Sequence, residues 1–109
     1  MNSVAMTEYR FEPATLTLAA GVEVRLTLEN RGTVMHEFAT PYLAEVEVKV
    51  ETGGVNVEAV GLGEVEVPPG GRAVLVFTPE ETGTFLFVCG ANKPVSHLRE
   101  GMRGTLVVH

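Results

Sequence analysis

Three side chains that bind soft metal ions lie close together near the end of the chain: the thiol of Cys89, the imidazole of His97 and the thioether of Met102. Cys89 is the only cysteine, and a second imidazole, that of His36, lies far upstream. Two imidazoles, one thiolate and a weak thioether form the ligand set of a trigonal copper site that transfers electrons. Such a site requires a fold that brings His36 to the segment carrying the other three residues.

Each of the four residues also has an ordinary explanation when it is taken alone. An isolated cysteine such as Cys89 is often a small buried hydrophobe, and Met102 could fill a gap in the core. A loop histidine such as His97 is usually solvated, and His36 could be a hydrogen-bonded strand residue. The combination favours a metal site, because the four required types are all present and three of them are clustered.

The elements that position these residues are predicted to be β-strands. Residues 22–29 alternate apolar and polar side chains, which is typical of a strand with one buried face. The same alternation places Phe85, Phe87 and Cys89 on one face of a strand over residues 84–89. Further extended segments are expected at residues 8–11, 15–18, 33–39, 44–51, 55–60, 64–67, 72–78 and 104–108.

Turn sequences separate these segments, notably Asn30-Arg31-Gly32, Gly53-Gly54 and Pro68-Pro69-Gly70-Gly71. No window has a helical period, so we expect an all-β fold of eight or nine strands, an antiparallel β-sandwich with Greek-key connections. A partly closed barrel is the alternative. Because the length is near the common domain size, residues 1–109 are expected to form a single domain.

The candidate ligands occur within a series of short motifs that runs along the chain. The series is Asn30-x-Gly32, His36-Glu37-Phe38, Gly83-x-Phe85-x-Phe87-x-Cys89, His97 and Gly101-Met102-x-Gly104-x-Leu106-x-Val108. This order resembles the cupredoxins, the small blue-copper proteins, and the likeness covers nearly the whole chain. The resemblance implies one copper ion per chain, Cu(I) or Cu(II). Its implied ligands are His36, Cys89, His97 and, as a weak axial ligand, Met102.

The sequence departs from the family pattern in the loop between Cys89 and His97. Seven residues separate the two, more than in the commonest members of the family. A longer loop can bulge outward and still return His97 to the metal, and Pro94 would stiffen it. Residues 43–67 are also long for a minimal member, and we expect an extra hairpin beside the core.

The resemblance implies a one-electron carrier that is not an enzyme, because four protein ligands leave no open position for a substrate. The expected partner is a redox protein of the cytochrome or oxidase type that docks near His97. In cupredoxins the loop imidazole is usually the most exposed ligand, and here that residue would be His97. The docking patch would comprise Pro94, Val95 and Leu98, with Lys93 and Arg99 at its rim.

Two other functions fit the same sequence. A copper-handling accessory protein, which delivers the metal to a partner, is suggested by Met35 beside His36 and by the unusual loop. A metal-free β-sandwich that acts as an interaction module is suggested by the long spacing between Cys89 and His97. Loading with copper discriminates between the metal-free module and the other two.

Composition sets further bounds on the function. Hydrophobic residues make up 45% and charged residues 20%, as in an ordinary globular protein, and no apolar tract could span a bilayer. The net charge of −6 disfavours nucleic acid as a partner, and a monomer is expected.

The first residues do not form a leader, yet the resemblance implies a periplasmic or otherwise exported protein. Glutamate supplies all the acid and arginine outnumbers lysine, which hints at a thermophile.

Overall fold

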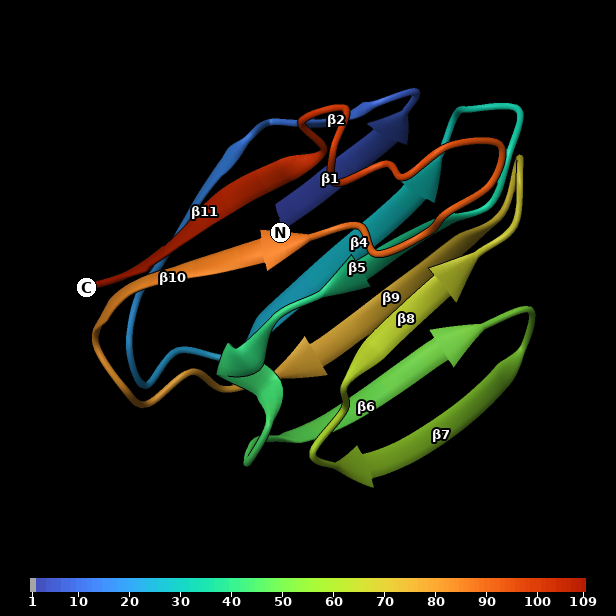
Figure 1. Cartoon of the computed structure of the whole chain (residues 1–109). Coiled ribbons are helices and arrows are strands. Elements are labelled where there is room, and N and C mark those ends of the chain that lie inside the picture. The colour runs from blue at the N-terminus through green and yellow to red at the C-terminus, as the bar shows by residue number, and fades with distance from the viewer. Residues whose placement is uncertain (1) are drawn as a thin grey trace.

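The computed structural model describes residues 2–109, which form two β-sheets packed face to face (Figure 1). A short 3-10 helix, η1 (Pro41–Leu43), follows one strand, and residues 2–109 contain no α-helix. No helix in this part of the chain has the length and apolar character needed to cross a membrane. The strands are β1 (Asn2–Thr7), β2 (Arg10–Glu12), β3 (Thr15–Leu18), β4 (Val24–Asn30), β5 (His36–Ala39), β6 (Glu47–Thr52), β7 (Val55–Val60), β8 (Glu64–Val67), β9 (Arg72–Phe77), β10 (Gly83–Val88) and β11 (Arg103–Val108).

The strand order is β2-β1-β4-β9-β6-β7 in the first sheet and β3-β11-β10-β5-β8 in the second. The predicted all-β sandwich is confirmed, but residues 2–109 contain eleven strands and not eight or nine. The sheets are also not purely antiparallel, because β1 pairs with β4 and β3 pairs with β11 in parallel. The sequence did not predict β1, whose only fully buried side chains are Val4 and Met6, too few to show a clear period.

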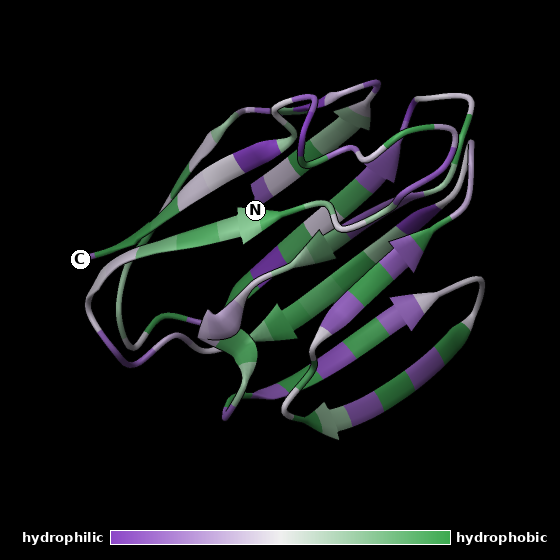
Figure 2. Ribbon diagram, in the orientation of Figure 1, coloured by the Kyte–Doolittle hydropathy of each residue, from purple (hydrophilic) through white to green (hydrophobic). Residues whose placement is uncertain are grey.

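The core lies between the two sheets and is built from alternating side chains. Along β4 the side chains of Val24, Leu26 and Leu28 are buried while that of Arg25 is exposed. Figure 2 shows the same alternation as green and purple bands along β6, β7 and β8. Burial of the inward faces of the strands supplies the main favourable free energy of such a sandwich, although β7 buries no residue.

The expected extra hairpin is formed by β6 and β7, which are joined by Gly53 and Gly54. Both glycines have positive φ, 56° and 79°, which the tight turn requires and which other residues avoid. Strand β6 pairs with β9, so β7 forms an outer edge of the first sheet. Strand β8 leaves the hairpin and pairs with β5 at the edge of the other sheet.

One strand pairing connects the two parts of the predicted site. Strand β5 begins at His36, and its Ala39 pairs with Val88, the last residue of β10. Cys89 follows β10 directly, and the segment between β10 and β11 carries His97 and Met102. The pairing of β5 with β10 therefore places the upstream histidine beside the downstream loop at one end of the sandwich (Figure 1).

Candidate metal centre

Three of the four predicted ligands meet at this end of the sandwich. The Nδ1 atoms of His36 and His97 are 3.2 Å apart, and the Sγ atom of Cys89 lies 3.4 Å from the Nδ1 atom of His97. One donor atom from each of the three residues falls within 4.8 Å of the others. All three side chains are fully buried.

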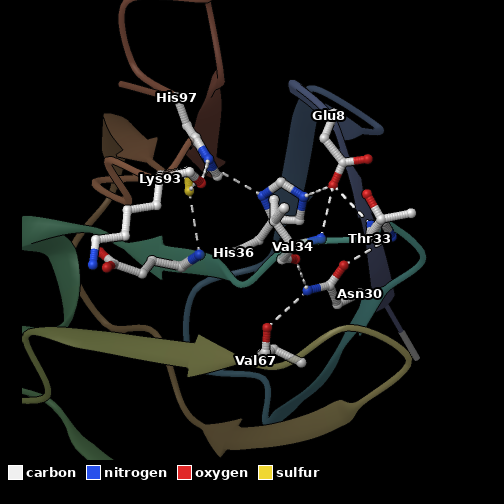
Figure 3. Close-up of polar contacts among 11 residues, drawn as sticks. Glu8, Asn30, Thr33, Val34, His36, Val67, Lys93 and His97 are labelled. Atoms are coloured by element: carbon white, nitrogen blue, oxygen red, sulfur yellow. Dashed lines mark hydrogen bonds and ion pairs between the residues drawn. The ribbon is translucent and has the colours of Figure 1, made fainter. Parts of the chain in front are cut away.

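The outer nitrogen of each imidazole is bound to an oxygen atom (Figure 3). The Nε2 atom of His36 lies 2.9 Å from Oε1 of Glu8, and the Nε2 atom of His97 lies 2.8 Å from the carbonyl oxygen of Lys93. A carboxylate and a carbonyl only accept hydrogen bonds, so each Nε2 must carry the proton. Each neutral ring therefore directs the Nδ1 lone pair at the centre of the cluster.

This arrangement fits a metal ion better than it fits a hydrogen-bonded core. Two Nδ1 lone pairs face each other across 3.2 Å, and neither can donate to the other. The thiol of Cys89 carries one proton and can satisfy only one of them. A soft cation bound by both imidazoles and the thiolate would satisfy all three donors, and such a donor set suits copper.

Two backbone amides approach the sulfur atom of Cys89. The N–H group of Glu37 donates a hydrogen bond to Sγ across 3.2 Å. Burial raises the pKa of the Cys89 thiol, while the N–H groups of Glu37 and Ala91 act in the opposite direction. A bound metal would remove the thiol proton outright, and the amides would then stabilise the thiolate.

Met102, the predicted axial ligand, is fully buried and is tied to two of the other residues through the backbone. The N–H group of Cys89 donates to the carbonyl oxygen of Met102 (3.1 Å), and the N–H group of Met102 donates to that of His97 (3.0 Å). These bonds fix the three residues relative to one another. The role of the thioether as a ligand stays a prediction.

The long loop returns His97 to Cys89 by folding on itself. The N–H group of His97 donates to the carbonyl oxygen of Ala91 (2.9 Å), which closes the loop at its base. Beyond His97 a tight turn is formed by the hydrogen bond from Gly101 N–H to the carbonyl oxygen of Leu98 (3.0 Å). The imidazole thus faces Cys89 despite the length of the loop.

His97 was expected to be the most exposed ligand, and this expectation is wrong because its side chain is fully buried. The carbonyl oxygen of Lys93 covers the Nε2 side, and the ring of Tyr9 lies 4.8 Å from the imidazole, centroid to centroid, at 56°. The long loop places Lys93 over the ring, and the segment after β1 supplies Tyr9. Val95 and Leu98 of the expected docking patch are exposed, whereas the His97 ring is not.

Sequence reasoning missed Glu8, whose carboxylate contacts His36. Its Oε1 atom also accepts hydrogen bonds from the N–H groups of Thr33 (2.9 Å) and Val34 (3.3 Å). Partial burial alone would raise the pKa of Glu8, but these hydrogen bonds and that with His36 lower it overall. Burial lowers the pKa of His36, and Glu8 acts against this shift.

Asn30 braces the turn that precedes His36. Its Oδ1 atom accepts from the N–H group of Gly32 (2.8 Å), and its Nδ2 group donates to the carbonyl oxygens of Val34 (2.9 Å) and Val67 (2.8 Å). The Asn30-x-Gly32 motif was a visible signal for this brace. Glu8 had no such signal, because it lies 28 residues from His36 in sequence.

A second group of carboxylates lies on the outer side of β5 and β8, formed by Glu37, Glu64 and Glu66. Burial, together with the neighbouring Glu64, raises the pKa of Glu37 to about 7. Glu64 and Glu66 are exposed, and clusters of exposed acidic side chains are common without an ion. These residues therefore belong to the acidic surface of the molecule.

A two-sheet sandwich that gathers two imidazoles and a thiol at one end defines a cupredoxin-like protein. The family model described as the cupredoxin-like domain matches residues 2–108. The chain belongs to this family, as the motif order predicted.

Comparison with known proteins gives one curated relative and several similar folds. The chain is 30% identical over 101 residues to the copper-resistant cuproprotein CopI of Rubrivivax gelatinosus, covering 91% of this chain and 59% of that protein. Reduced auracyanin of the photosynthetic bacterium Roseiflexus castenholzii is 18% identical, with a TM-score of 0.67 over 99% of this chain and 95% of that one. A multicopper oxidase of Campylobacter jejuni, 15% identical, has a TM-score of 0.67 over 98% of this chain and 29% of that one.

Proposed function

We propose that this protein is a mononuclear type 1 copper protein that carries single electrons between redox partners. The observation that carries the proposal is the convergence of both Nδ1 atoms on Sγ of Cys89 while oxygen atoms occupy both Nε2 positions. Copper, when bound, would supply the one-electron couple between Cu(I) and Cu(II). His36, Cys89 and His97 would hold it, with Met102 as the weak axial ligand.

The protein residues have three tasks in this proposal. The thiolate and thioether favour Cu(I), while the imidazoles suit both oxidation states. The buried donors exclude water, and the backbone bonds among Cys89, His97 and Met102 restrict their movement. Cu(I) and Cu(II) prefer different geometries, so a rigid ligand set that is intermediate between them needs little rearrangement when the oxidation state of copper changes. A small rearrangement favours fast electron exchange. Four protein ligands also leave no position for a substrate, so we propose no enzymatic activity.

The proposed partner is a redox protein that docks over the ligand loop. This end of the molecule exposes the apolar side chains of Met35, Val95 and Leu98. Lys93 and Arg99 are exposed beside them and would favour an acidic rim on the partner. We propose that the protein works outside the cytoplasm as a monomer.

Titration of the metal-free protein with Cu(II) tests the function. We expect binding of one copper ion per chain and an intense visible absorption from the thiolate. Cys89→Ser should abolish the absorption, while His109→Ala, which removes an exposed histidine, should leave it intact. A colourless protein that binds no stoichiometric copper would contradict the proposal.

A copper-handling role is the second candidate, and one observation favours it. The relative with 30% identity is a copper-resistant cuproprotein, of which the chain spans 59% of the length. Mixing the Cu(I)-loaded protein with a copper-free acceptor and with a cytochrome separates the two functions. Metal transfer without electron exchange would favour copper handling, and rapid electron exchange without transfer would favour the carrier.

A further inference from the structure

Glu8 lies in the turn between β1 and β2 and reaches across to His36 (Figure 3). Its side chain is 28% exposed, whereas that of His36 is fully buried. One oxygen atom, Oε1, contacts three nitrogen atoms: Nε2 of His36 at 2.9 Å and the backbone nitrogens of Thr33 and Val34. Three N–H groups directed at a single oxygen favour the ionised carboxylate.

The fold leaves space for this contact on the side of Gly32. A Cβ atom at Gly32 would overlap Oε1 of Glu8 and would lie 2.8 Å from Nε2 of His36. Only glycine therefore leaves room for the carboxylate at this point. Asn30 holds Gly32 and Val34 in place through their backbone groups. The turn at Gly32 is therefore shaped to accept the carboxylate of Glu8 beside His36.

The two imidazoles differ in the charge of their outer partner. His97 donates to the neutral carbonyl of Lys93, whereas His36 donates to a carboxylate. A carboxylate partner makes an imidazole a stronger electron donor to a metal. Its negative charge lies against the fully buried ring of His36 and favours the more highly charged ion. His97 provides the comparison within the same site.

We propose that Glu8 is a positioning residue that fixes the Nε2-protonated form of His36 and that its charge favours Cu(II) over Cu(I), which lowers the reduction potential. The inference rests on the proposed copper function. Because the charge of Glu8 favours Cu(II), its removal should weaken Cu(II) binding more than Cu(I) binding. Loss of such an outer partner commonly costs about 10- to 100-fold in metal affinity.

The experiment compares Glu8→Gln with the matched control Glu12→Gln. Glutamine keeps the size of the side chain and an acceptor oxygen but removes the charge. Glu12 is exposed, pairs with Arg10 and has no contact with the site. We expect Glu8→Gln to lower the ratio of Cu(II) to Cu(I) affinity about tenfold or more. Each tenfold fall in this ratio raises the reduction potential of the bound copper by about 59 mV. Glu12→Gln should leave the ratio within twofold of the parent protein.

A restoring variant separates charge from shape. Glu8→Asp keeps the charge, so its potential should lie below that of Glu8→Gln. Equal potentials in the parent protein and Glu8→Gln would overturn the effect of the charge. If Glu8→Gln does not fold, the potential of Glu8→Asp should still lie below that of Glu8→Ala, which lacks both the charge and the acceptor oxygen, and equal potentials in these two variants would overturn the proposal.

Nitrogen NMR of the metal-free protein tests the positioning role without copper. The parent protein and Glu8→Gln should show His36 protonated at Nε2, while Glu8→Ala should show a mixture of the two neutral forms. An unchanged His36 in Glu8→Ala would overturn the positioning role. If the parent protein bound no copper, the proposed function would fail and the effect on potential with it, and the NMR result would still decide the positioning role.

Discussion

Each imidazole of the site presents its Nδ1 atom because an oxygen atom occupies its Nε2 side. For His97 that oxygen is the backbone carbonyl of Lys93, which no side-chain substitution removes. For His36 it is the carboxylate of Glu8, so this half of the site depends on a single side chain. The two histidines are therefore held by different means, although they supply the same atom to the centre.

Asn30→Ala should destabilise the protein by about 3 kcal/mol, because a buried group left without its partner costs about 1–3 kcal/mol. The change would unpair the N–H group of Gly32 and the carbonyl oxygens of Val34 and Val67. Urea unfolding of the metal-free protein measures the loss. Asn56→Ala, at an exposed position of β7, is the control and should change stability by less than about 0.5 kcal/mol.

The pairing of β10 with β11 depends on a close approach at one position. Gly104 lies opposite Phe87, and a Cβ atom there would overlap the Phe87 ring and lie 2.6 Å from the carbonyl oxygen of Ala14. The ring of Phe87 also contacts the rings of Phe11 and Phe38. Because these rings hold Phe87 in place, it cannot move aside for a side chain at position 104.

Gly104→Ala should therefore destabilise the protein by about 2 kcal/mol, within the range for overpacked cores. The thermal midpoint of the metal-free protein is a suitable measurement. Gly63→Ala is the matched control, because a Cβ atom at Gly63 meets nothing within 4 Å. A similar loss in both variants would show that the contact with Phe87 is not the cause.

The hairpin of β6 and β7 is anchored by one strand only. Val48 of β6 is fully buried, whereas Val57 of β7 is 51% exposed although it lies on the same face. Val48→Ala should cost about 2 kcal/mol, since it removes buried methyl groups and leaves a cavity. Val57→Ala should cost less than about 0.5 kcal/mol. Chemical unfolding of the two variants measures this difference. Equal losses of unfolding free energy would mean that the side chain of Val57 is buried like that of Val48.

At the scale of the whole molecule, the site joins parts of the chain that are far apart. His36 and His97 are 61 residues apart: His36 begins β5, and His97 lies in the loop that follows the neighbouring strand β10. Glu8 and Tyr9 add the segment that follows β1 of the other sheet. A metal bound at this point would therefore stabilise the folded state as a whole.

Copper at 100 times its dissociation constant should stabilise the folded protein by up to about 2.7 kcal/mol, if the unfolded chain does not bind it. Thermal unfolding with Cu(I) under reducing conditions, before and after a chelator, measures the gain. Cys89→Ser should reduce the gain, while His109→Ala should retain it. An equal gain in Cys89→Ser would show that copper stabilises the protein from another site.

The sequence by itself determined the all-β class, most of the strands other than β1, their buried faces and the candidate ligands. Alternation along β4 and β9 predicted which side chains enter the core, because the side-chain period of a strand is a local property. The order of motifs around His36, Cys89 and His97 predicted the family.

Only the tertiary structure decided what surrounds the ligands. The parallel pairing of β1 with β4 places Glu8 and Tyr9 against the two histidines, and the fold of the loop buries His97 under Lys93. These contacts join segments that no short-range pattern connects. The physical reason is that strand pairing and loop conformation are set by the free energy of the whole chain. Local periodicity depends only on neighbouring residues and does not predict them.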